Sequence, residues 1–296
     1  AGNGDVGSVK YYKGKFEAYQ RTYVLTKFDR ADPKYLYYNL RDKLKETVST
    51  QKLGNTMPYI KMGMISTFKV PLPPLEVQCE IVAEIEGYQK LIDGCRQVVD
   101  SWKPQIDIDP EWPFESLDLL CKEIRNGINV EQIDEIGKYR VTRIQTISDG
   151  SVNLDKTKWT NDEVKDSAFM LDGDILLSHI NSIEHLAKSA IFTGIKEKVV
   201  HGINLIRLRP NRDKVNPSFL SIMLKQDWFV NKARTFAQKA VNQASIKTSD
   251  LKDIKIPLPS LEVQQGIVDC IEAERKVIDG CRELIKIYED KIKRVI

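Results

Sequence analysis

The chain has few of the residues on which most metal and covalent catalytic sites depend. It contains three His and five Cys in 296 residues, and the cysteines show neither a CxxC pair nor a zinc-site spacing. No apolar run approaches the roughly 18 residues that a membrane-spanning helix needs, and no signal-peptide pattern begins the sequence. We therefore expect a soluble protein of a reducing cytoplasm, with no cofactor, in which Cys95 and Cys281 are small apolar packing groups.

Some motifs in the sequence are similar to enzyme signatures, but the residues around them do not fit an enzymatic site. Residues 2–7 spell GxGxxG, but no strand precedes them and a strand-like segment follows, unlike a dinucleotide site. Residues 32–35 (DPKY) and 216–219 (NPSF) are similar to the Asp/Asn-Pro-Pro-aromatic signature of adenine methyltransferases, yet both lack the second proline. A helix cap followed by Pro at the first helical position explains both. No Ser or Cys nucleophile motif accompanies the histidines, so we expect a chain without catalysis of its own: His179, His185 and His201.

What the sequence does contain is a tandem repeat. Residues 71–96 (PLPPLEVQCEIVAEIEGYQKLIDGCR) and 257–282 (PLPSLEVQQGIVDCIEAERKVIDGCR) align without a gap at an offset of 186, and 17 of 26 positions are identical. The Pro-Leu-Pro sequence suits the start of a helix, and Ser260 is a plausible N-cap. A repeat of this strength must be recognised before any local pattern is interpreted.

Apolar residues follow each Pro-Leu-Pro at alternating spacings of four and three. This period predicts two long helices that pair with each other as an antiparallel coiled coil. The alternative is two amphipathic helices that each pack on their own domain. The residues expected in the helix seam are Ile81, Ile85, Tyr88, Ile92 and Cys95 in the first copy, and Ile267, Ile271, Ile278, Cys281 and Ile285 in the second.

Charge is distributed unevenly. Residues 1–70 carry 13 basic and 6 acidic side chains, whereas residues 71–110 carry 3 and 8. Residues 111–256 carry 22 and 20, and residues 257–296 carry 7 and 8. The helices are thus neutral to acidic and the first segment is basic, which is compatible with a phosphate-backbone partner.

The segments before the two helices share a pattern. Residues 7–14 parallel 188–194 and residues 22–29 parallel 203–210; all four predict strands. Residues 31–44 and 215–228 each predict a helix that begins at Asp-Pro or Asn-Pro.

Only the second unit has an earlier half, with a possible helix in 113–124 and strands in 139–147 and 174–179. The counterpart in the first unit would precede residue 1, so we expect the sequence to begin inside a domain. We place the boundaries at 1–70, 71–110, 111–256 and 257–296: two mixed α/β domains and two helices, an α+β fold class.

This order of segments resembles the DNA specificity subunit of type I restriction–modification systems. The Leu-Pro-x-Leu-Glu-x-Gln start of a long helix, present twice, carries the resemblance. It implies two target-recognition domains that each read half of a bipartite site in double-stranded DNA, held apart by a helical ruler. It also implies two methyltransferase subunits, usually two restriction/translocase subunits, and no membrane. The alternative function is the recognition module of a single-chain methyltransferase/restriction enzyme.

DNA-contact candidates are polar residues able to read base edges or phosphates. The best stretch is the loop after the strand at 174–179, with Ser178, His179, Asn181, Ser182, His185 and Lys188. Second-line candidates are Arg125, Asn126, Arg140, Arg143 and Gln145. The first domain contributes Asn3, Tyr19, Gln20, Arg21, Lys52, Asn55, Tyr59 and Lys61.

Overall fold

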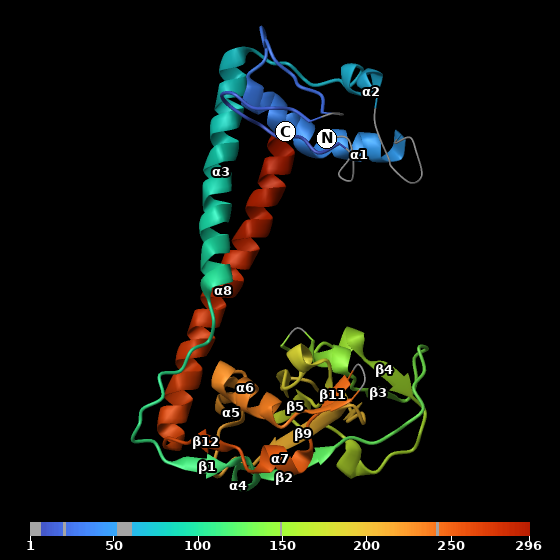
Figure 1. Ribbon diagram of the computed structural model, residues 1–296, viewed down its shortest axis with the longest axis vertical. Helices are drawn as coiled ribbons and strands as arrows, with labels where there is room; N and C mark the ends of the chain where they lie inside the picture. The colour runs from blue at the N-terminus through green and yellow to red at the C-terminus, as the bar shows by residue number, and fades with distance from the viewer. Residues whose placement is uncertain (1–6, 20–21, 52–60, 149, 241–242) are drawn as a thin grey trace. The chain divides into compact units, whose positions relative to one another are not determined.

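The computed structural model describes residues 7–19, 22–51, 61–148, 150–240 and 243–296 (Figure 1). Its contacts divide the chain into two compact units. Unit 1 is residues 1–102 with 276–296, and unit 2 is residues 103–275. Within the described residues, unit 1 is helical and unit 2 combines sheet and helix. None of the described helices is both long and apolar enough to cross a membrane.

Unit 2 is built on a four-stranded antiparallel sheet in the order β2-β9-β5-β7. A three-stranded sheet β4-β3-β8, a pair β1-β12 and a three-stranded sheet β10-β11-β6 surround it. The strands are β1 (Phe114–Ser116), β2 (Cys121–Asn126), β3 (Tyr139–Val141), β4 (Lys158–Thr160), β5 (Asp174–Ser178), β6 (Ile180–Asn181), β7 (Ser189–Phe192), β8 (Val199–Val200), β9 (Leu205–Pro210), β10 (Gln238–Ala240), β11 (Gln243–Ser245) and β12 (Lys255–Pro257).

The two central strands of the main sheet are buried along their length. All five residues of β5 are buried, and in β9 only Arg209 is partly exposed. Continuous Ile and Leu runs of this kind belong to strands covered on both faces. Short helices and 3₁₀ turns complete unit 2: α4 (Leu117–Leu120), η1 (Ile144–Ile147), η2 (Leu154–Lys156), η3 (Asp166–Ala168), η4 (Ile183–His185), α5 (Pro217–Met223), α6 (Asp227–Thr235) and α7 (Thr248–Lys252).

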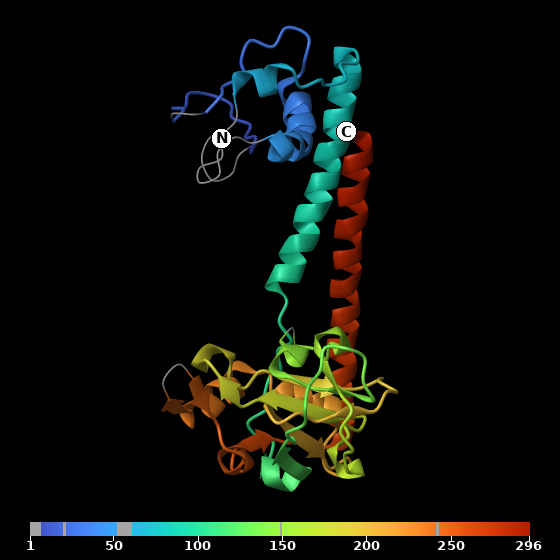
Figure 2. The ribbon, with the colours of Figure 1, turned by 90° about the vertical axis from the view of Figure 1, so that its right-hand side faces the viewer.

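Unit 1 contains α1 (Pro33–Gln51), α2 (Met62–Ser66), α3 (Leu75–Ser101) and the C-terminal part of α8 (Leu261–Val295). The α3 and α8 segments lie side by side in both views (Figures 1 and 2). Tyr88 and Tyr288 have ring centroids 5.3 Å apart, and burial, followed by the neighbouring Cys281, raises the pKa of the Cys95 thiol. Because residues later in α3 meet residues earlier in α8, the two helices run antiparallel.

The expected seam residues are distributed over two environments. Ile85, Ile92 and Ile292 are buried in one apolar cluster with Tyr35 and Tyr38 of α1, and Ile81, Tyr88 and Ile285 pack against it. Ile271 and Ile278 are buried, whereas Ile267, Cys95 and Cys281 are partly exposed.

The first turns of α3 thus pack on a helix of their own unit, and later turns meet α8. Within unit 1, α3 therefore makes both kinds of contact, with the helix α1 of its own unit and with α8.

Four expectations about secondary structure need correction. Residues 7–14 and 22–29 form no strand in their described parts. The expected helix in 113–124 is a helix only at Leu117–Leu120 and otherwise two strands, because β1 and β2 find partners in β12 and β9. The expected strand in 139–147 ends at Val141 and gives way to a 3₁₀ turn.

Candidate nucleic-acid interface

The loop after β5 is held in a defined conformation on the surface of unit 2. Ile180 and Asn181 form β6 and pair with β11, and a 3₁₀ turn follows at Ile183–His185. Arg234 of α6 donates hydrogen bonds to two carbonyls of the loop, Glu184 O at 2.7 Å and Leu186 O at 3.3 Å. Ala187 closes the loop with φ 61°, a backbone conformation that non-glycine residues rarely adopt. The loop is thereby fixed at both ends.

His185 and Lys188 project from this loop into solvent, and Asn181 and Ser182 are half-buried. The Asn181 side chain accepts a hydrogen bond from the Ser182 backbone N–H at 2.9 Å, which orients the amide. A fixed loop that presents an imidazole, an ammonium and an amide has groups suited to base edges and phosphates.

Ser178 and His179 are corrections to the expected contact set. Both side chains are buried, Ser178 at 1% and His179 at 5% exposure, so they lie below the surface that a duplex could reach. Ser178 is the last residue of the fully buried strand β5 and His179 follows it directly, where the pattern of the sequence does not distinguish a core position from a loop position. Burial lowers the pKa of His179 to about 4, so the ring is neutral at physiological pH.

Two of the five second-line candidates, Arg125 and Arg140, are engaged in the fold of unit 2. Arg140 donates to Glu197 Oε2 and Leu154 O, both at 2.9 Å, and its guanidinium lies over the ring of Trp159. Arg125 donates to Ser167 O at 2.5 Å. These arginines stabilise loops and have little freedom to leave them. The remaining candidates are exposed or half-buried on the surface: Asn126, Arg143 and Gln145.

Most of the DNA-contact candidates of the first domain lie outside the described residues. Tyr19 is 85% exposed and Lys61 is exposed, so both are available at the surface of unit 1. The others lie outside the described residues: Asn3, Gln20, Arg21, Lys52, Asn55 and Tyr59.

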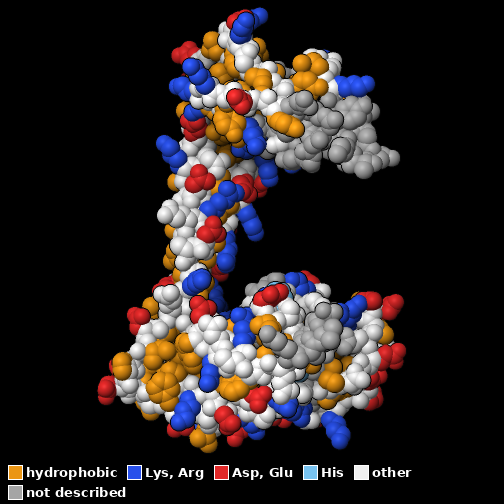
Figure 3. Space-filling view, in the orientation of Figure 1, with side chains coloured by type: hydrophobic (Ala, Val, Ile, Leu, Met, Phe, Trp, Pro, Cys, Tyr) orange, Lys and Arg blue, Asp and Glu red, His pale blue; other side chains and the backbone are white. Residues whose placement is uncertain are grey.

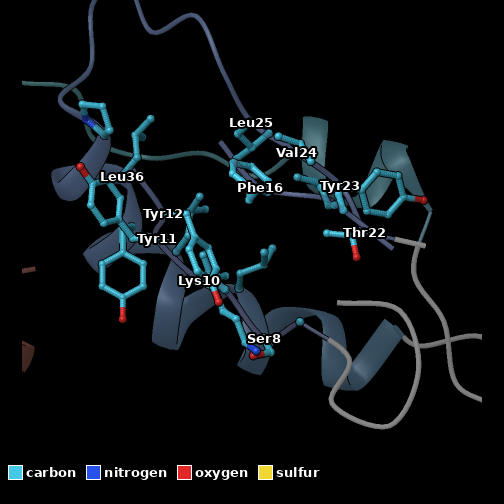
Figure 4. Close-up of a pocket in the computed structure, with 18 of the residues that line it drawn as sticks. Ser8, Lys10, Tyr11, Tyr12, Phe16, Thr22, Tyr23, Val24, Leu25 and Leu36 are labelled. Atoms are coloured by element: carbon cyan, nitrogen blue, oxygen red, sulfur yellow. The ribbon is translucent and has the colours of Figure 1, made fainter. Parts of the chain in front are cut away.

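Unit 1 carries an apolar cavity of about 370 Å³ between its N-terminal segments and α1. Figure 4 shows Tyr11, Tyr12 and Phe16 together with Val24 and Leu25 around it. Several of these side chains remain exposed, and hydrophobic patches interrupt the charged surface of unit 1 (Figure 3). The described lining of the cavity is mainly apolar and aromatic, with Lys10 and Glu17 among the other residues, as is typical of an incompletely covered core surface.

A buried ion network in unit 2 was not expected from the sequence. The Arg207 side chain in β9 is fully buried, bonded to Glu123 and to Phe169 O at 3.0 Å, and Arg209 pairs with Asp174 at 2.8 Å. Burial lowers the pKa of Arg207, with the Glu123 hydrogen bond opposing it. The arginines of a strand pattern usually indicate its solvent face, so only the fold could reveal this network.

Two further residues, Gln78 and Gln264, were also missed. Both are fully buried and hydrogen-bonded, and the signal that could have found them is their identical position in the two repeats. Among the described residues, no group of three or more His, Cys, Asp or Glu side chains could hold a metal ion.

Known proteins are similar to this chain in sequence. The chain is 38% identical over 185 residues to a putative type I restriction enzyme MjaX specificity subunit of Methanocaldococcus jannaschii, covering 61% of this chain and 43% of that protein. It is 26% identical over 316 residues to the type I restriction enzyme EcoDI specificity subunit of Escherichia coli, covering 92% of this chain and 69% of that protein.

A solved structure of the type I R-M system contains a chain with a similar fold. It matches at a TM-score of 0.54 and 20% identity, covering 90% of this chain and 71% of that one. This likeness supports the expected mixed helix-and-sheet class. The chain spans less than half the length of its M. jannaschii relative. The model of one family, the type I restriction modification DNA specificity domain, matches residues 1–97 and 113–290, and the chain therefore belongs to that family.

Proposed function

We propose that this chain is a DNA-recognition subunit of a type I restriction–modification complex, in which two domains read a bipartite site. Its family membership supports this reading. The observation that carries it is the antiparallel meeting of two repeat-related helices, marked by the contacts Tyr88–Tyr288 and Cys95–Cys281. Two such helices, each attached to a domain of related sequence, suit a reader of two separated half-sites.

In this proposal α3 and α8 form the ruler that sets the distance between half-sites. Seven residues inserted after Gly94, with seven more after its repeat equivalent Gly280, keep both apolar seams in phase. The helices lengthen by about 10 Å, from about 1.5 Å per residue. That is roughly three base pairs at about 3.4 Å each, or about a third of a turn.

Selection of bound sites from a DNA pool with random spacers tests the ruler. The expected result is the same half-sites with a spacer about three base pairs longer, or loss of binding because one domain faces the wrong side. Two-residue insertions at the same two positions, which rotate the apolar face by about 200° and so break the seam phase, are the matched control and should weaken binding at every spacer. Tight binding of the heptad variant at the original spacer would contradict the ruler.

The loop at 180–188 is the proposed reading element of unit 2. Asn181→Ala or His185→Ala should weaken binding of the specific site by about 1–3 kcal/mol if the side chain makes a base contact. Lys188→Ala should weaken binding to all sequences alike and reduce the salt slope by about one unit. Lys90→Ala, on the exposed surface of α3, is the control and should change neither. Unchanged affinity in all three loop variants would mean that the loop is only solvated surface.

We further propose that the helices hold two methyltransferase subunits. Each helix carries a second apolar stripe beside its seam, here called the outer stripe: Leu91, Gly94 and Val98 on α3, and Val277, Gly280 and Leu284 on α8. The members correspond at the offset of 186, their large side chains are exposed, and both glycines face open space. Because the outer stripes of α3 and α8 occupy equivalent positions, they support two equivalent binding sites, one on each helix.

Co-purification with the methyltransferase subunit measures this stoichiometry. Leu91→Asp and Val277→Asp should each reduce the complex from two methyltransferase subunits to one, and the double variant should bind none. Lys90→Asp, one residue away from the outer stripe, should leave two bound. Loss of both subunits in either single variant would contradict separate sites.

The chain itself is proposed to be non-catalytic. A purified sample incubated with DNA and a labelled methyl donor should transfer no label until the methyltransferase subunit is added. Label transfer by the chain alone would contradict the proposal that it is non-catalytic.

A further inference from the structure

We infer that Gln78 and Gln264 are positioning residues that hold each long helix at a fixed direction on its own domain. They occupy equivalent positions in the two repeats, the fourth residue of α3 and of α8. Both side chains are 0% exposed. A buried primary amide must find partners for its N–H groups and its oxygen, because each unpaired group costs free energy.

In unit 1, the Gln78 amide bonds to three backbone groups. Its Nε2 donates to Pro73 O at 2.7 Å and to Arg30 O at 3.1 Å, and its Oε1 accepts from Asp32 N–H at 2.7 Å. Pro73 precedes α3, whereas Arg30 and Asp32 precede α1. One side chain therefore ties the start of α3 to the segment before α1, whose bonded residues lie 46 and 48 positions earlier in the sequence.

Unit 2 repeats this arrangement. The Gln264 Nε2 donates to Pro259 O at 2.8 Å and to Lys214 O at 3.5 Å, and its Oε1 accepts from Asn216 N–H at 2.8 Å. Pro259 precedes α8, and Lys214 and Asn216 precede α5. The two loops share little sequence, yet the same backbone groups are bonded in both.

The tied loop residue also caps a helix in each unit. Asp32 Oδ1 accepts from the N–H groups of Lys34 and Tyr35, and Asn216 Oδ1 accepts from those of Ser218 and Phe219. The amide and the cap therefore form one unit, here called the joint. An amide is suited to this place because it donates and accepts at once, which neither an aliphatic side chain nor a carboxylate can do.

Apolar packing supports the joint over the next two turns. Val82 and Ile85 are buried on α3, and their repeat equivalents Val268 and Ile271 are buried on α8. Hydrogen bonds at one end and packed side chains along the following turns fix both the position and the direction of the helix. This inference rests on the proposed function in one respect: a helical ruler can set a spacing only if each domain is held firmly on its helix.

The test uses the full chain with Gln264→Met, Gln264→Glu and Glu272→Met. The first conserves volume and removes all three hydrogen bonds, and the last is a control at an exposed residue about two turns further along α8. Amide hydrogen exchange is measured at residues 214–219 and 259–264. Gln264→Met should lower protection there about tenfold or more, while β5 and β9 keep theirs and Glu272→Met changes nothing.

Gln264→Glu adds a pH readout that a general loss of packing would not give. A protonated carboxyl can donate one hydrogen bond and accept one, and so can replace two of the three bonds of the amide, whereas a carboxylate facing two carbonyl oxygens can donate none. Protection at the joint should therefore approach that of the wild type as the pH falls from 8 to 5, and Gln264→Met should show no such recovery.

The positioning role is tested by selection of DNA sites with random spacers. Gln264→Met should keep the same half-sites but accept several spacers where the wild type accepts one. Unchanged exchange at the joint, or a spacer preference that stays sharp despite increased exchange, would overturn the inference. If the wild-type chain shows no site-specific binding, the proposed function fails, and exchange and its pH dependence alone decide whether the joint exists.

Discussion

The two units contain the same run of segments in different surroundings. In unit 2, residues 205–210 form β9 between β2 and β5, and Leu205, Ile206 and Leu208 are 0% exposed. The corresponding residues 22–29 of unit 1 form no strand in this structure, and Val24, Leu25 and Phe28 are 46%, 48% and 38% exposed. The same pattern of residues thus gives a central strand in one unit and an extended segment in the other.

The helices do not show this difference. Both α1 and α5 form after a capping Asp or Asn followed by Pro, and both long helices form after Pro-Leu-Pro. Helical hydrogen bonds are satisfied within the segment, whereas strand hydrogen bonds need a neighbouring strand. The comparison teaches that a strand pattern is conditional on a partner and a capped helix pattern is not.

The largest expected difference between the two units is in the free energy of unfolding that is lost when matched apolar residues are replaced by Ala. Ile206→Ala leaves a cavity between β2 and β5 and should reduce the free energy of unfolding of unit 2 by about 2–5 kcal/mol. Leu25→Ala, at the corresponding place in unit 1, should cost less than about 1 kcal/mol because its side chain is half exposed already. Denaturant dependence of amide exchange, read separately in each unit, measures both. Equal losses would mean that unit 1 buries this segment as unit 2 does.

Lowering the pH should destabilise unit 2 more than unit 1, because every histidine of the chain lies in unit 2. Burial lowers the pKa of His201 to about 3, with the Arg207 charge contributing, and that of His179 to about 4. Their folded-state pKa values lie below the unfolded value of about 6.5. Their contribution to stability is therefore complete above pH 6.5 and is lost as the pH falls toward the folded values.

The loss should reach about 2 kcal/mol per buried histidine by pH 5. It is measured as the free energy of unfolding of unit 2 between pH 7 and pH 5. His201→Gln should flatten this dependence, and the exposed-site variant His185→Gln should leave it unchanged. A pH dependence of the same size in unit 1, which has no histidine, would contradict the assignment.

Removal of a helix N-cap side chain should destabilise the two units by similar amounts. Asp32→Ala and Asn216→Ala should each cost about 1 kcal/mol, the usual value of an N-cap side chain. Exchange of the amides in the first turn of α1 and of α5 measures the two losses. Ser218→Ala, next to the cap and half-buried, is a control that should cost less. A cap effect confined to unit 2 would show that α1 depends on neighbours rather than on its own start.

The smallest effect concerns the ion pair between the long helices. Arg96 Nη2 donates to Glu289 Oε1 at 2.6 Å, but both side chains are about half exposed. A double-mutant cycle of Arg96→Ala and Glu289→Ala should give a coupling below about 1 kcal/mol that decreases with salt. A coupling well above that would mean that the charges, and not the apolar seam, determine the pairing.

Some features could be predicted because residues close together in the sequence determine them. These are the repeat, the two long helices and the starts of α1 and α5. The strands at 174–179, 188–194 and 203–210 were predicted from apolar runs, and β5, β7 and β9 lie within them. The predicted strand at 22–29 was wrong although its pattern is similar. The difference is the presence of β2 and β5, which no local pattern contains.

Of the candidate site, the sequence determined the loop and the residue types, and the tertiary structure decided which of them reach solvent. Asn181, His185 and Lys188 lie on the fixed loop, while Ser178 and His179 are covered by neighbouring strands. Likewise the sequence determined that Gln78 and Gln264 are equivalent, and only the fold decided that each joins two helix starts. Spacing along a chain fixes local hydrogen bonds and the faces of helices. Burial and long-range partners depend on which distant segments meet, and that is a property of the folded chain.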